Sequence, residues 1–231
     1  TNPHLTITNQ NLKLIMTTDL ASKLRSGTQQ AHSNAEHTKF MGRFLKGAID
    51  ENLLGKLLGN LYYIYSQLEA ELECHQAHAI VGCMYFPELN RRANIEKDLA
   101  FLYGDNWQEK VLPTPNAQVY LSRIREVSAT QPELLIAHAY TRYMGDLSGG
   151  QSLKRIAQAA LGLREDQSIN FYEFSQIADL NEFKGKYRDA LNNLSIDEAL
   201  INQMVEEANL AFTLNIKMMA DLEEINAPAL V

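Results

Sequence analysis

The feature that most constrains this chain is a set of three glycines within six residues, Gly145 to Gly150, placed between two helix-forming stretches at 133–144 and 151–161. Glycine inside a helix costs about 1 kcal/mol relative to alanine, so three cost about 3 kcal/mol of a typical domain's roughly 5–15 kcal/mol. A chain that keeps these glycines needs a stretch of backbone without side chains at this place. The usual gain is the close approach of another body, or a bend that side chains would block.

The local sequence leaves two interpretations of this segment open. The helix is kinked and continues, or it stops with Gly145 in the left-handed conformation and restarts with Ser148 as N-cap and Gln151 at the third position. The spacing from Gly145 to Ser152 also matches a phosphate-binding loop. That motif requires lysine where Gln151 stands and a strand before the loop, and Asp146 adds negative charge, so we reject nucleotide binding.

Length and composition indicate one globular domain. The 231 residues are 45% hydrophobic and 21% charged, enough for a real core. The net charge of −7 argues against general nucleic-acid binding. The two cysteines, Cys74 and Cys83, are too few for a disulfide framework, which favours a reducing compartment. No apolar run is long enough for a membrane span. We therefore expect a soluble, cytoplasmic protein.

The first residues differ from the rest. Residues 1–15 are polar and show no helical pattern, whereas Met16 is followed by Thr17, Thr18 and Asp19, a good helix start. We expect 1–15 to be a disordered leader or an expression remnant. Residues 16–231 are expected to form a single all-helical domain.

Apolar residues recur at helical spacing along nearly the whole chain. Spacings of three and four run from Leu54 to Leu72 and from Ile201 to Met219. No convincing strand pattern or long repeat is present. The sequence therefore predicts an all-α fold, with further helices at 19–37, 39–48, 88–103, 116–129 and 179–192 and a loop-rich stretch at 162–178.

His32 on the first predicted helix is a candidate metal ligand. A lone histidine near an apolar face is more often structural, but Glu36 lies one turn away and can hold one ring nitrogen while the other binds a metal. No three of the other histidines share a tight spacing that would suit zinc, and His75 and His78 read as a solvated helix face. A single axial histidine suits haem, because the porphyrin supplies the remaining in-plane ligands.

A helix bared by glycines would make a wall for a flat macrocycle, with Asp146 beside it. The haem propionates need cations at the edge, and the candidates are Arg25, Lys184 and Arg188. Lys184 and Arg188 are four residues apart and share one helix face. The alternative for these three residues is an ordinary solvated cationic face.

Several blocks of the sequence together resemble the haem oxygenase family. They cover almost the whole chain from about residue 19 to 222, and the block from His138 to Gln151 is the most specific. Animal members usually end in a hydrophobic anchor that is not seen here, so the chain is most similar to the soluble cyanobacterial and plastid type. The matching blocks are Thr28–Glu36, Leu61–Tyr65, Leu99–Gly104, His138–Gln151, Lys184–Arg188 and Glu206–Ile216.

The resemblance implies a single-domain, haem-oxygenase-like fold with haem b between a proximal and a kinked distal helix. His32 matches the axial ligand of the haem iron and Glu36 its orienting acid. Gly145 and Gly149 match the glycines at which the distal helix of the family kinks. Asp146, Tyr65 and Arg142 match residues of the family's distal water network. Further haem contacts are implied for Arg25, Tyr140, Thr141, Lys184, Arg188, Phe212 and Asn215.

The resemblance also implies an activity: opening of haem at a meso carbon, with the alpha carbon expected, to biliverdin IXα, carbon monoxide and ferrous iron, using O₂. No flavin or nicotinamide fingerprint is present, so electrons come from outside. Ferredoxin is the expected donor, docking on Lys154, Arg155, Lys184 and Lys186, and a bilin reductase is an expected downstream partner in phycobilin synthesis. We expect a monomer. The alternatives are a non-catalytic haem carrier or sensor and a related helical protein with another ligand, such as a thiamine-degrading enzyme.

Overall fold

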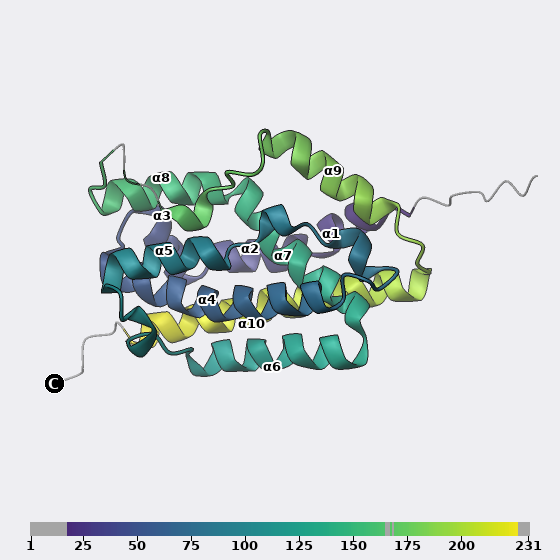
Figure 1. The fold of residues 1–231 in the computed structure, drawn as a ribbon, viewed down its shortest axis with the longest axis horizontal. Helices are drawn as coiled ribbons and strands as arrows, with labels where there is room; N and C mark the ends of the chain where they lie inside the picture. The colour runs from purple at the N-terminus through teal and green to yellow at the C-terminus, as the bar shows by residue number, and fades with distance from the viewer. Residues whose placement is uncertain (1–17, 165–166, 168, 226–231) are drawn as a thin grey trace, which may run out of the picture.

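The computed structural model describes residues 18–164, 167 and 169–225, and this part of the chain is helical without strands (Figure 1). The proposed leader at 1–15 lies outside the described residues. The all-α prediction is confirmed. The α-helices are α1 (Leu20–Gly27), α2 (Gln29–Glu36), α3 (Lys39–Leu45), α4 (Glu51–Cys74), α5 (Arg92–Tyr103), α6 (Pro115–Thr130), α7 (Leu135–Ser148), α8 (Gly150–Ala160), α9 (Leu180–Asn192) and α10 (Glu198–Ile225). Short 3₁₀ helices are η1 (Val81–Met84), η2 (Pro87–Leu89), η3 (Trp107–Glu109), η4 (Pro132–Leu134) and η5 (Asn170–Tyr172).

Side-chain caps fix where several helices begin. Asp50 accepts a hydrogen bond from the N–H of Leu53 at 2.8 Å and starts α4. Thr114 caps α6, where Pro115 takes the first helical position and needs no N–H partner. Asp179 accepts from two backbone N–H groups at the start of α9. The caps of α6 and α9 lie within two residues of the predicted starts at 116 and 179, whereas Asp50 starts α4 four residues before the predicted run from Leu54.

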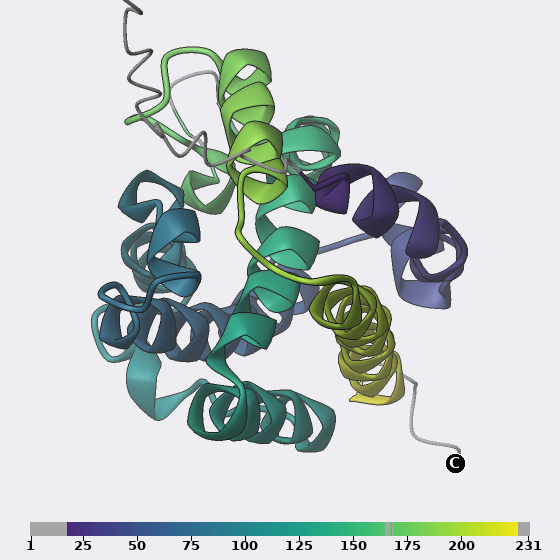
Figure 2. The same ribbon diagram turned by 90° about the vertical axis from the view of Figure 1, so that its right-hand side faces the viewer.

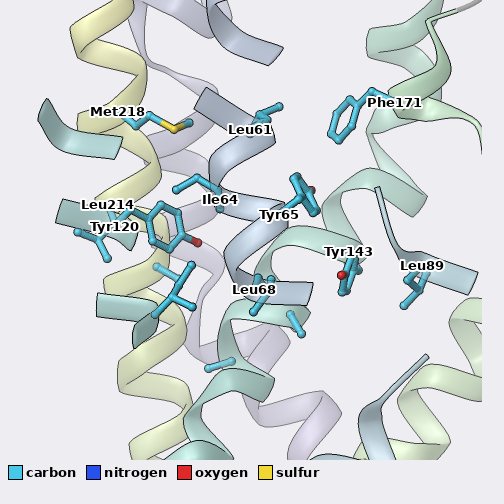
Figure 3. Packing of buried hydrophobic residues seen from close by; sticks show 14 of the residues in the cluster. Leu61, Ile64, Tyr65, Leu68, Leu89, Tyr120, Tyr143, Phe171, Leu214 and Met218 are labelled. Atoms are coloured by element: carbon cyan, nitrogen blue, oxygen red, sulfur yellow. The ribbon is translucent and has the colours of Figure 1, made fainter. Parts of the chain in front are cut away.

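The core is built around α4, which packs against α5, α6, α7 and α10. Ile64, Tyr65 and Leu68 on α4 are completely buried, and Leu214 and Met218 of α10 lie on one side of them (Figure 3). A fully buried leucine or isoleucine contributes roughly 1.5–3 kcal/mol. Packing around α4 therefore fixes the positions of the surrounding helices. Among the described residues, no helix has the length and apolar content that crossing a bilayer requires.

The predicted single helix at 19–37 is divided into α1 and α2, so that expectation is wrong in detail. The interruption falls at Thr28, whose φ of −106° and ψ of 2° leave the helical region. A Cβ added at Gly27 would lie 2.5 Å from a methyl carbon of Val205, so α10 passes close to the bare backbone there. This close approach and the bend at Thr28 set the direction of α2.

The glycine-rich segment bends without leaving the right-handed helical region. Gly149, between α7 and α8, has φ −70° and ψ −26°, and the positive-φ glycines in the described chain are elsewhere. Ser148 does not cap α8, and the side-chain amide of Gln151 donates to the carbonyl of Tyr172 at 2.9 Å. α7 and α8 run in different directions (Figures 1 and 2). The kinked helix is confirmed, and neither a stop-and-restart nor a phosphate loop is present.

His75 and His78 do not lie on a helix as predicted. α4 ends at Cys74, and both histidines occupy the turn that follows it. His75 Nε2 lies 3.0 Å from the hydroxyl of Ser128, and His78 Nδ1 accepts from two backbone N–H groups. Both side chains are half-buried and hold the turn together, because the chain needs partners for its backbone after the helix ends.

Candidate functional site

Three helices, α2, α7 and α10, position the predicted site residues. The ring of His32 on α2 meets the ring of Phe212 on α10 edge-on, with 5.8 Å between centroids. Asn215, three residues further along the same face of α10, accepts a hydrogen bond from Arg142 of α7 at 2.8 Å. α10 packs against both α2 and α7, with α7 (teal) to its left and α1–α2 (purple) to its upper right in Figure 2. α10 therefore forms the floor between the proximal and distal helices.

His32 has the environment of a prepared ligand. Its Nδ1 lies 3.6 Å from a carboxylate oxygen of Glu36, an ion-pair distance, and both side chains are more than half exposed. No protein group in the described part of the chain bonds to its Nε2. A carboxylate at one nitrogen orients the ring and leaves the other available to a metal.

On the distal side, four predicted residues form one hydrogen-bonded network. The hydroxyl of Tyr65 donates a short hydrogen bond to Asp146. Arg142 donates from Nε to the Tyr65 hydroxyl at 3.1 Å, and its terminal nitrogen lies 4.0 Å from Asp146. Arg142 also binds Asn215, as described above. The structure thus brings together residues from α4, α7 and α10.

The electrostatics of this network act on Asp146, which is only 6% exposed. Burial raises the pKa of the Asp146 carboxyl above its usual range, while the charge of Arg142, the Tyr65 hydrogen bond and the charge of Arg91 oppose that rise. Burial also raises the pKa of Tyr65 well above the ordinary tyrosine value, so Tyr65 remains a donor. Asp146 therefore takes up a proton more readily than an exposed aspartate does.

The glycines of the distal helix present bare backbone to open space. A Cβ built at Gly145 would meet nothing within 4 Å, and one at Gly149 would meet only the Gly145 carbonyl oxygen at 3.9 Å. The two residues are four apart and share one helix face. Gly150 differs, since its Cβ would lie 3.2 Å from the ring of Tyr172. Gly145 and Gly149 thus leave a surface that a flat ligand can approach closely, whereas Gly150 serves packing.

Cations gather where α7 meets the junction of α1 and α2. Tyr140 makes a side-chain hydrogen bond with Thr28. Burial raises the pKa of Tyr140, and the nearby positive charges of Arg25 and Arg188 oppose that rise. Arg25 and Arg188 are exposed, and neither forms an ion pair with a described carboxylate. Lys184 lies one turn before Arg188 on α9. The structure thus brings Arg25 and Arg188 together near Tyr140, and a propionate contact for Lys184 stays a prediction.

Thr141 faces its own helix. Its hydroxyl donates to the carbonyl of Ala137 at 2.9 Å, and the side chain is buried. A haem contact for Thr141 stays a prediction. The predicted docking cations are partly paired, since Lys154 lies 2.7 Å from Glu173 and Lys186 lies 3.7 Å from Glu88.

Arg91 is a residue near the network that sequence reasoning missed. It is 3% exposed, donates to the carbonyls of Leu89 at 2.8 Å and Phe171 at 3.1 Å, and stacks 3.8 Å over the ring of Phe174. Its charge lowers the pKa of Asp146, as noted above. Nothing in the sequence separates Arg91 from the exposed Arg92 beside it, because the difference arises only from packing.

A second buried polar cluster joins α6, α7 and α10. His138, fully buried, has Nε2 2.8 Å from Glu207, and Arg123 makes two hydrogen bonds to the same carboxylate at 2.9 and 2.6 Å. Burial alone would raise the pKa of Glu207, but the hydrogen bonds from Arg123 and His138 outweigh it and lower that pKa to about 2. This cluster lies two turns from Asp146 along α7 and holds the three helices together.

Among the described residues no group of three or more histidine, cysteine, aspartate or glutamate side chains could hold a metal ion. The described residues around His32 therefore do not form a complete ligand set for a lone metal ion. Haem brings four in-plane nitrogens and needs one axial histidine. His32, the bare face of Gly145 and Gly149, and the cationic edge all fit such a group.

Comparison with known proteins identifies a family with members solved in complex with heme, in agreement with the geometry of this site. The family model described as "Heme oxygenase" matches residues 18–221. A relative described as "Heme oxygenase 2" from Synechocystis sp. is 52% identical over 90% of this chain and 84% of its own length, and "Heme oxygenase 1" from Nostoc sp. is 50% identical over 90% and 87%. The crystal structure of heme oxygenase-1 from Synechocystis sp. in complex with heme has a TM-score of 0.88 at 50% identity, covering 90% of this chain and 94% of that one. The chain belongs to the haem oxygenase family.

Proposed function

We propose that this chain binds haem b between α2 and α7 and cleaves it at a meso carbon, the alpha carbon, to biliverdin IXα, carbon monoxide and ferrous iron. The reaction uses O₂ and electrons from an external donor. The single observation that carries the proposal is the Tyr65–Asp146–Arg142 network beside the bare face of Gly145. Haem oxygenases solved with heme share the fold at a TM-score of 0.88.

Each part of the site has a task in this proposal. His32 would bind the haem iron, and Glu36 would hold the His32 ring. Haem, when bound, is the substrate and supplies the iron at which O₂ reacts. Gly145 and Gly149 let the ring plane lie against backbone, so that no side chain occupies the space beside the iron.

Asp146 controls protons. Its carboxyl is buried, held by Tyr65 and shielded from bulk water, and so it orders water and passes protons at the distal face. The cations at the edge, Arg25, Lys184 and Arg188, hold the propionates. Because they fix the rotation of haem in its plane, they decide which meso carbon faces the distal network.

The electron donor is expected to be ferredoxin, an acidic partner that would dock near the haem edge. Two of the four proposed docking cations, Lys154 and Lys186, already face carboxylates, and Lys184 is also assigned to a propionate, so Arg155 is the docking cation without an ion pair among the described residues. Turnover should then fall with rising ionic strength. Replacing Arg155 with Gln should weaken that salt dependence, and unchanged rates and slope would reject this docking site. A soluble cytoplasmic monomer and a downstream bilin reductase remain predictions.

A non-catalytic haem carrier is the competing function. A carrier needs His32 and the cationic edge but has no use for Asp146 or its network. The distinguishing experiment compares wild-type protein with Asp146→Ala. We expect the variant to bind haem normally and to lose most of its biliverdin yield. A near-normal yield in the variant would remove Asp146 from the reaction, and absence of biliverdin from both proteins would favour the carrier.

A further inference from the structure

A buried carboxyl group, Glu69, lies close to the distal network and has no part in the site described so far. It stands one helical turn after Tyr65 on α4, on the same face, and is 7% exposed. Its carboxylate accepts hydrogen bonds from the backbone N–H of Arg91 (a short contact) and of Arg92 at 3.3 Å, at the start of α5. Within the described residues, its hydrogen-bond donors are backbone N–H groups and not lysine or arginine side chains.

A buried tyrosine hydroxyl without a partner lies within electrostatic reach of both Glu69 and the network. The hydroxyl of Tyr143 on α7 is buried and makes no hydrogen bond to the described protein. Burial raises the pKa of Tyr143, and the charge of Glu69 is the largest charge contribution to that rise. The Tyr143 ring lies 5.9 Å from the ring of Tyr65, whose hydroxyl binds Asp146 (Figure 3). Tyr65 is therefore hydrogen-bonded to one buried acid, and its ring neighbour Tyr143 responds to the charge of the other.

One buried cation acts on both acids. Arg91 interacts electrostatically with Asp146 and with Glu69, although its guanidinium hydrogen-bonds only to backbone carbonyls. Arg92 of α5, Tyr85 before η2 and Tyr187 of α9 also interact electrostatically with Glu69 or Tyr143. The Tyr187 hydroxyl is also buried without a partner. A buried polar site of this kind holds ordered water in most proteins.

We propose that Glu69 stores a proton for Asp146, and that the proton moves between the two carboxyl groups through the hydroxyls of Tyr143 and Tyr65 and an internal water at the free Tyr143 hydroxyl. The proton leaves the Glu69 carboxyl and arrives at the Asp146 carboxylate. The Glu69 carboxylate that remains is held by the two N–H groups at the start of α5 and regains a proton from solvent. This inference rests on the proposed haem cleavage.

The titration of Glu69 supports this role. Burial raises the pKa of Glu69 to about 7, even though the hydrogen bonds from Arg91 and Arg92 oppose the rise. An ordinary glutamate is ionised at neutral pH, with a pKa of about 4.3. Glu69 therefore exists in both forms near pH 7, as a group that releases and regains protons must.

The test compares Glu69→Gln with Glu73→Gln, an exposed position on the same helix. The glutamine keeps an oxygen for the N–H groups of Arg91 and Arg92 but cannot titrate. In haem-free protein, infrared spectra recorded across neutral pH should show a protonated carboxyl C=O band that titrates near pH 7 in wild type and Glu73→Gln and is missing in Glu69→Gln. Retention of that band in Glu69→Gln would overturn the assignment, whether or not the protein cleaves haem.

Turnover provides the second readout. Glu69→Gln should lower the rate of haem cleavage about a hundredfold, at the low end of general acid–base effects, and flatten its pH profile near 7 while haem affinity stays constant. Tyr143→Phe should lower the rate similarly while keeping the infrared band, and the double variant should be no slower than either single one. If the rate reductions of the two single variants multiply in the double variant, the two residues do not share one proton route. A wild-type pH profile in Glu69→Gln would also contradict that route. Failure of wild type to cleave haem would reject the proposed function instead.

Discussion

The hydroxyl of Tyr65 on α4 donates a hydrogen bond to Asp146 on α7, across 81 positions of sequence. Arg142 closes the arrangement by binding the Tyr65 hydroxyl from the other side. The contact holds the Asp146 carboxylate at the end of α7 where the backbone becomes bare. The distal acid is thus positioned by the core helix α4 as well as by its own helix.

Removing that hydrogen bond should raise the pKa of Asp146, because the Tyr65 hydroxyl opposes the effect of burial. We predict that Tyr65→Phe moves the pH profile of haem cleavage to higher pH and leaves haem binding intact. The measurement is kcat against pH. Tyr62→Phe, whose ring packs against Trp107, serves as control. A downward shift, or an equal shift in both variants, would contradict this view of Asp146.

His32→Ala should remove the axial ligand of haem. We predict a large change in the Soret band of added hemin and loss of turnover, because the other histidines in the described part of the chain already bond to protein groups. His37→Ala is the matched control, since His37 ends the same helix and its Nδ1 bonds only to the Ser33 carbonyl. An unchanged hemin spectrum in His32→Ala would reject His32 as the ligand.

Gly145→Ala should separate folding from haem binding. The new methyl group meets nothing within 4 Å, so the helix should gain up to about 1 kcal/mol in unfolding free energy. The same methyl would press on bound haem at an overpacking cost of about 1–3 kcal/mol, or roughly tenfold in affinity. Thermal unfolding and hemin titration measure the two effects. Gly42→Ala, equally open, should show only the first. Unweakened haem affinity in Gly145→Ala would mean that haem does not lie against this face.

The Glu207 cluster predicts how stability depends on acid. The folded pKa of Glu207 is about 2 against an ordinary 4.5. A depressed acid pKa stabilises the fold above the unfolded value, and the contribution disappears as pH falls from about 4.5 to 2. At neutral pH this amounts to about 3 kcal/mol. Glu207→Gln should therefore lower Tm strongly at pH 7 and much less near pH 3, whereas exposed Glu206→Gln should do neither. A Tm difference that stays constant with pH would contradict the ionic role.

Sequence periodicity predicts most helices because their apolar residues pack on α4 and α10. It fails at Thr28, where the break depends on Val205 approaching Gly27, a contact that no local pattern contains. In the site, His32, Tyr65, Arg142 and Asp146 are predictable because they lie in specific motifs. Arg91, Glu69 and the free Tyr143 hydroxyl are not, since their importance comes from burial and charge in the folded chain.

The most direct test of the account is to add hemin to the purified chain, supply O₂ and an electron source, and follow the absorption spectrum. We predict that the Soret band decays while biliverdin and carbon monoxide form in step with the haem lost. A Soret band that persists through reduction and aeration, or hemin that does not bind, would contradict the proposed function.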